Sequence, residues 1–85
     1  MKYVLLFSES CNYIILDNEV ELIEHLHKMY VEGRRKEVKI VKCEKIIDFT
    51  RKVAKVLDTA LSIAEGTVNH EKAQYIAELI FEVGE

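Results

Sequence analysis

The sequence contains no proline and only three glycines among its 85 residues. Because these residue types mark most turns, the connections between helices and strands are expected to be few and short. No stretch approaches the ~18 consecutive apolar residues that a membrane-spanning helix needs. The first apolar run ends at Phe7, which is too short for the apolar region of a signal peptide. We therefore expect a cytoplasmic protein with no membrane partner, forming a single domain over residues 1–85.

Cysteine and histidine are scarce, and their spacing does not fit a metal site. Cys11 and Cys43 lack the C-x-x-C pattern of zinc and redox sites. His25 and His27 stand two residues apart and diverge by about 200° on a helix, whereas metal-binding histidines stand four apart. We expect no bound metal, a small core residue at Cys43, and an exposed loop residue at Cys11.

The motifs of common enzyme active sites are also absent. The sequence has no glycine-rich phosphate loop, no G-x-S-x-G motif and no paired-carboxylate motif. A chain of this length has little room for both a core and a pocket of a few hundred Å³. We predict that the protein is not an enzyme and has no cofactor.

The first half of the chain contains strand-like segments around one helix. Residues 2–7 and 13–16 are rich in β-branched and aromatic residues and predict an antiparallel hairpin. Asn18 with Glu21 three residues later resembles a capping box, which predicts a helix over residues 18–32 that ends at Gly33. Residues 37–43 predict a third strand, with Val38 and Ile40 facing inward.

The second half predicts two helices with wide apolar faces. A helix from about residue 45 or 48 to 65, ended by Gly66, confines its polar residues to a wedge of about 140°. A last helix over residues 70–83, capped by Asn69, is apolar over about 200°. Composition alone would also allow a strand at residues 79–83, and only the helical period argues against it.

Such faces exceed the stripe slightly wider than about 100° that an ordinary surface helix buries. One small sheet is not enough to cover both, so we expect a homodimer through the last two helices. Its expected interface consists of Val53, Leu57, Leu61, Ile76, Ile80 and Phe81.

These elements together predict an α+β fold with the order β-β-α-β-α-α. The hairpin and the third strand are expected to form a small antiparallel three-stranded sheet with the first helix on one face. The last two helices are expected to form a C-terminal αα-hairpin.

A formal net charge of −3 hides a segregation of charge along the chain. Residues 1–33 carry two basic residues against six acidic ones, residues 34–55 nine against three, and residues 56–85 one against six. Such asymmetry bears on partners rather than on the fold. Acidic stripes on the first and last helices form one candidate partner-binding surface: Glu21, Glu24, Glu32, Glu71, Glu78 and Glu82. The basic centre forms an alternative surface: Arg34, Arg35, Lys36, Lys39 and Lys42.

The basic centre has three open interpretations: a solvated turn and strand edge, a site for an acidic protein or a second subunit, and a nucleic-acid site. No aromatic residue lies between residues 31 and 48, so no platform for stacking single-stranded bases is evident. The acidic helices on either side would repel nucleic acid. Direct nucleic-acid binding through residues 34–55 is therefore the alternative rather than the leading hypothesis.

The first half of the chain resembles small phage-encoded proteins of low-GC Gram-positive hosts, many of which begin with a hairpin and an acidic helix. The segments that carry this resemblance are Tyr3-Val4-Leu5-Leu6-Phe7, Tyr13-Ile14-Ile15-Leu16-Asp17 and Glu21-Leu22-Ile23-Glu24-His25-Leu26. They contain no site motif, so no functional residue is transferred. The resemblance implies a host-takeover role, in which the protein binds a host protein and alters its activity.

The sequence thus predicts a non-enzymatic, homodimeric protein-binding module. The resemblance makes it a phage-type modulator or inhibitor of a host protein. If that host protein binds nucleic acid, the acidic helix faces would block it by imitating rows of phosphates.

Overall fold

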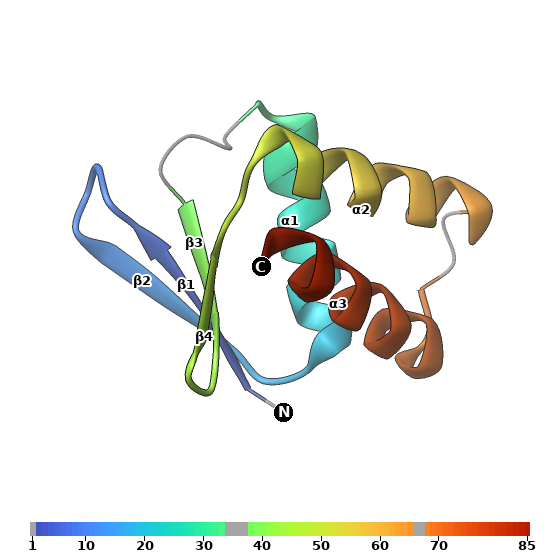
Figure 1. The fold of residues 1–85 in the computed structure, drawn as a ribbon, viewed down its shortest axis with the longest axis horizontal. Coiled ribbons are helices and arrows are strands. Elements are labelled where there is room, and N and C mark those ends of the chain that lie inside the picture. The colour runs from blue at the N-terminus through green and yellow to red at the C-terminus, as the bar shows by residue number, and fades with distance from the viewer. Residues whose placement is uncertain (1, 34–37, 66–67) are drawn as a thin grey trace.

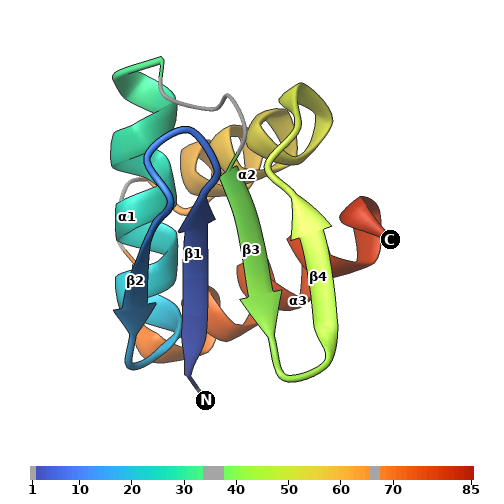
Figure 2. The ribbon, with the colours of Figure 1, turned by 90° about the vertical axis from the view of Figure 1, so that its left-hand side faces the viewer.

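The computed structural model describes residues 2–33, 38–65 and 68–85, which form two layers. The sheet contains β1 (Tyr3–Phe7), β2 (Asn12–Leu16), β3 (Val38–Lys42) and β4 (Lys45–Asp48), and the helices are α1 (Glu19–Val31), α2 (Arg51–Ile63) and α3 (His70–Gly84). All three helices cover the same face of the sheet, and no described helix or strand covers its other face (Figures 1 and 2). The fold is therefore α+β with the order β-β-α-β-β-α-α.

The sheet is antiparallel throughout, with the strand order β2-β1-β3-β4. Its helix-facing side carries a row in which Leu5 pairs with Ile14 and with Ile40, and Ile40 pairs with Ile47. Leu5 and Ile40 are fully buried under the helices. The alternation of strand side chains therefore supplies one half of the core, and Val38 and Ile40 face inward as predicted.

Side-chain caps fix where each helix begins. The side chains of Asn18, Thr50 and Asn69 accept hydrogen bonds from the backbone N–H three residues later, at 3.0, 3.3 and 2.8 Å. The end of α1 is marked by Gly33, whose φ of 76° suits a residue without a Cβ atom. The predicted bounds of the first and last helices are confirmed to within one residue. Gly66, the expected end of the second helix, lies outside the described residues.

The fourth strand was not predicted from the sequence. Residues 45–48, which helical periodicity assigned to the second helix, form β4, and α2 begins only at Arg51. Ile40 pairs with Ile47 and Val41 with Ile46, and the ladder continues to a bond from the Phe49 N–H to the Val38 carbonyl. Pairing with β3 satisfies these backbone groups, so the sheet has four strands instead of three.

Cys43 is exposed, and the prediction of a core cysteine is wrong. Together with Glu44 it forms the two-residue turn between β3 and β4, where its φ is 52°. Cys11 is exposed in the β1–β2 loop, as expected, and also has a positive φ, of 55°. No helix in the part of the chain that the structure describes is long and apolar enough to cross a membrane.

Candidate protein-binding groove

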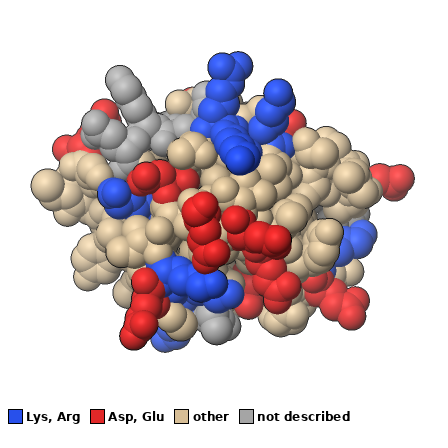
Figure 3. Space-filling model, in the orientation of Figure 1, with Lys and Arg blue, Asp and Glu red and all other residues tan. Residues whose placement is uncertain are grey.

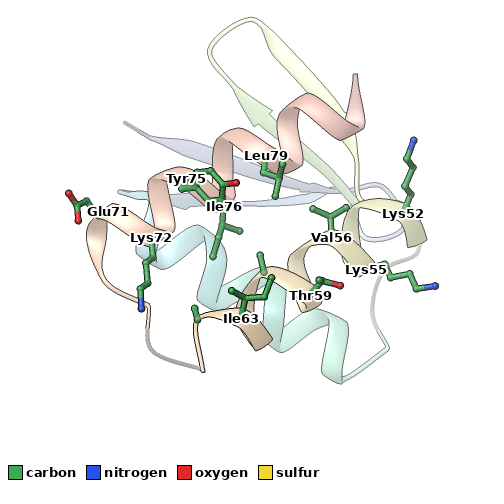
Figure 4. A pocket seen from close by; sticks show the side chains of 12 residues that line it. Lys52, Lys55, Val56, Thr59, Ile63, Glu71, Lys72, Tyr75, Ile76 and Leu79 are labelled. Atoms are coloured by element: carbon green, nitrogen blue, oxygen red, sulfur yellow. The ribbon is translucent and has the colours of Figure 1, made fainter.

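An apolar groove of about 860 Å³ lies between α2 and α3. One wall comes from α2 and the other from α3, and apolar side chains such as Val56, Ile76 and Leu79 lie in the space between them (Figure 4). The groove is lined by Lys52, Lys55, Val56, Thr59, Ala60, Ile63, Ala64, Glu71, Lys72, Tyr75, Ile76 and Leu79.

The wide apolar face of α2 explains the first wall. One side of the helix is buried in the core through Val53, Leu57 and Leu61. The adjoining side carries Val56, which is half-buried, and Ile63, whose residue surface is 79% exposed. The sequence pattern predicted that α2 is apolar on two sides. In the structure the core covers the side with Val53, Leu57 and Leu61, and the adjoining side borders the groove.

The second wall belongs to α3. Ile76 lies at the base of the groove and is buried, Leu79 is half-buried, and Tyr75 is 66% exposed at the rim. Large apolar side chains that remain this exposed beside a concave surface are typical of binding sites.

The six residues expected at a dimer interface are all buried in the single chain, and of these only Ile76 also lines the groove. Each is at most 7% exposed and belongs to the core of the single chain, so none forms a surface for a second chain to contact. The buried side of α2 packs against α1 and α3, and the buried side of α3 packs against α1, α2 and β4. These buried residues are Val53, Leu57, Leu61, Ile76, Ile80 and Phe81.

Charges mark the two ends of the groove. Lys52 and Lys55 extend from the first turns of α2 at one end, and Glu71 and Lys72 lie at the other (Figure 4). Basic atoms gather over the beginning of α2, and acidic atoms gather over α3 (Figure 3). The lining itself carries three lysines and one glutamate, so it has a positive bias.

The glutamates of both predicted acidic stripes are exposed. Glu71, Glu78 and Glu82 are exposed on α3, which packs behind β4, and the stripe of α1 lies at the opposite edge of the sheet, behind β2 (Figure 2). On α1 the exposed members are Glu21, Glu24 and Glu32.

Glu21 also stabilises the beginning of α1. The Glu21 carboxylate accepts a hydrogen bond from the Asp17 backbone N–H at 2.8 Å, which fixes the entry into the helix. Glu21 and Glu24 line a second hollow of about 400 Å³ with Leu16, His25 and Lys28.

The described part of the basic segment is divided among several surfaces. Lys39 pairs with Asp48 at 3.1 Å on the open face of the sheet. Lys42 lies on the opposite face, with its Nζ atom 5.7 Å from the centre of the Phe81 ring. Lys45 pairs with Glu85 at 2.9 Å. Arg34, Arg35 and Lys36 lie outside the described residues.

Within the described ranges, no three histidine, cysteine, aspartate or glutamate residues are arranged to hold a metal ion. His25 and His27 are both half-buried on α1. Cys11 and Cys43 lie in loops at opposite ends of the sheet (Figure 2). That no metal binds stays a prediction.

Comparison with known proteins gives no relative: no protein-family model, curated protein or solved structure matches the chain. Function is therefore inferred from the geometry of the molecule. The sequence contained a signal for the groove, namely the second apolar side of α2. Helical periodicity does not say which part of a wide apolar face the core will cover, so it could not single out Val56 and Ile63 as the side chains that border the groove.

Proposed function

We propose that the protein is a non-enzymatic protein-binding module whose α2–α3 groove receives an amphipathic helix from a partner protein. The observation that carries this proposal is the apolar groove with Ile63 and Tyr75 exposed at its edge. The resemblance of the first half of the chain to phage-encoded proteins implies that the partner is a host protein whose activity is altered by binding.

The shape of the groove favours a helix as its occupant. A helix is about 10 Å across and fits between two others, with anchors at positions i, i+3, i+4 and i+7. The 13 residues of α2 make that wall about 20 Å long at 1.5 Å per residue. An occupant of three to four turns would therefore fill the groove. A second copy of the same groove is concave too and fits it less well.

The charges of the groove favour an acidic occupant. Lys52 and Lys55 lie beside the N-terminus of α2, where the helix dipole adds partial positive charge. Carboxylates flanking the apolar face of a partner helix would complement this end. Such complementarity contributes to the association rate and to specificity more than to affinity.

A second candidate places the acidic stripe of α3 in contact with the partner, which would then be a basic, nucleic-acid-binding protein. The exposure of Glu71, Glu78 and Glu82 beside the groove favours it. The two candidates predict opposite charge preferences, so one experiment separates them.

The test uses two designed amphipathic peptides of about four helical turns that share a leucine face. One has a glutamate-rich polar face and the other a lysine-rich polar face. Fluorescence anisotropy should show that the acidic peptide binds at least about tenfold more tightly, a difference of about 1.4 kcal/mol. Lys52→Glu with Lys55→Glu should reverse this preference.

The matched controls change exposed side chains in the groove or away from it. Ile63→Gln with Tyr75→Gln should weaken binding of the acidic peptide about tenfold or more, since both side chains border the groove. Ile15→Thr with Ile46→Thr, on the open face of the sheet, should leave binding unchanged. If all these variants bind the acidic peptide equally well, the groove is not its binding site. A preference for the basic peptide that is lost with Glu78→Lys and Glu82→Lys would establish the second candidate instead.

A further inference from the structure

The open face of the sheet carries a continuous apolar row. Ile15 pairs with Val4, Val4 with Val41, and Val41 with Ile46, so the row crosses all four strands. Ile15 and Ile46 are 56% and 60% exposed at the two edges of the sheet. Figure 2 looks onto this face, and no described element covers it.

A second row lies beside the first and combines apolar residues with one ion pair. Leu6 pairs with Tyr13 and with Lys39, and Lys39 pairs with Asp48. Tyr13 is 64% exposed. The Lys39 ammonium lies 3.1 Å from the Asp48 carboxylate, so the two charges of these rows compensate each other on the face itself.

We propose that this face is the surface through which two copies of the chain associate, sheet against sheet. An interface between identical copies must be complementary to itself, and a face with net charge would repel its own copy. The two rows are apolar apart from one compensated pair, which avoids that repulsion. The acidic side of α3 and the basic beginning of α2 do not satisfy this condition.

The shape of the two faces agrees with their charge. A sheet presents a shallow twisted surface, and two such surfaces pack about 10 Å apart with their side chains interdigitated. The four β-branched side chains of the first row, at Val4, Ile15, Val41 and Ile46, suit such packing. A concave groove has no such complement in its own copy.

The open face is smaller than a standard stable interface. Four strands at about 4.8 Å and five residues at about 3.3 Å give roughly 300 Å² in projection. A standard stable interface buries about 800 Å² of accessible surface on each partner. The association is therefore weak and depends on concentration. Because it uses no groove residue, it leaves both α2–α3 grooves free.

Sedimentation equilibrium from about 10 µM to about 1 mM covers the range in which a weak complex forms. The apparent mass should rise from 9.9 kDa toward twice that value. Ile15→Lys with Ile46→Lys should hold the mass at that of one chain at every concentration. The milder Ile15→Thr with Ile46→Thr keeps β-branched side chains and should weaken the association several-fold.

The matched control is Ile63→Lys, the same substitution at an exposed isoleucine that borders the groove. It should associate like the unaltered chain. Far-UV circular dichroism and urea midpoints identify any variant that fails to fold. A single-chain mass for the unaltered protein at about 1 mM would overturn the proposal. So would association that Ile63→Lys abolishes and the sheet variants do not, because this would place the interface at the groove. Peptide binding by single chains at low concentration tests the groove separately.

Discussion

At the scale of single residues, the turn between β3 and β4 contains an unfavourable backbone conformation. Cys43 has a φ of 52°, in the left-handed region that costs a residue with a Cβ atom about 1 kcal/mol. Glycine is favoured at the first position of such two-residue turns. Cys43→Gly should therefore raise the free energy of unfolding by about 1 kcal/mol in urea denaturation.

The control for this prediction is Cys43→Ala, which removes the thiol and keeps the Cβ atom. It should give no gain in stability. If alanine and glycine stabilise the protein equally, the thiol rather than the backbone conformation is the cause.

Tyr3 is the residue with a clear pH signature. Burial, together with the smaller effect of the negative charges of Glu19 and Glu78, raises its pKa to about 12. The unfolded chain releases this proton near pH 10 and the folded chain near pH 12. The contribution to stability is therefore fully present below pH 10 and is lost as the pH rises to 12.

An absorbance titration of tyrosinate should show one transition near pH 12, and Tyr3→Phe should remove it. The difference in urea midpoint between the two proteins should change only above pH 10. A midpoint difference that is constant with pH would contradict the raised pKa of Tyr3.

At the scale of elements, the helix boundaries were readable from the sequence because polar caps mark them. Asn18 and Asn69 precede their helices at the expected positions. The boundary before α2 was missed although Thr50 caps it, because Ile46 and Phe49 match helical spacing with Val53 as well as they match a strand. The turn that closes the β3–β4 hairpin also lacks the Asn-Gly or Asp-Gly pair that usually signals one.

The two apolar sides of α2 should respond differently to the same substitution. Leu57 is fully buried, so Leu57→Glu places an uncompensated charge in the core and should cost about 3 kcal/mol or more. That is much of the stability of a small domain, at about 5 kcal/mol. Ile63 is 79% exposed, and Ile63→Glu should change the free energy of unfolding by less than about 0.5 kcal/mol.

Urea denaturation followed by circular dichroism distinguishes the two outcomes. A large loss of stability for Ile63→Glu would mean that the groove side of α2 is covered in solution. In the sequence, Leu57 and Ile63 both belong to the apolar face of the helix. Only the packing of α2 against the rest of the chain buries one and leaves the other exposed.

At the scale of the whole molecule, the fold divides its apolar surface between two layers. The helix layer carries a groove with a positive bias, and the sheet layer carries a shallow twisted face on which Lys39 and Asp48 form an ion pair. The wide apolar face of α2 in the sequence already indicated an uncovered apolar surface on the helix layer. The apolar face of the sheet could not be predicted without β4, since only this fourth strand extends the apolar row to Ile46.

If the sheet faces join two chains and the grooves stay open, the dimer presents two peptide sites. On a surface densely coated with the acidic amphipathic peptide, a dimer would be held at both sites, and dissociation would be slower than from one site. Ile15→Lys with Ile46→Lys should therefore shorten retention about tenfold on a dense surface and leave it unchanged on a sparse one, since the monomer keeps an intact groove. Surface plasmon resonance at two peptide densities measures both values. Equal retention of the variant and the unaltered chain on the dense surface would show that the two sites do not act together.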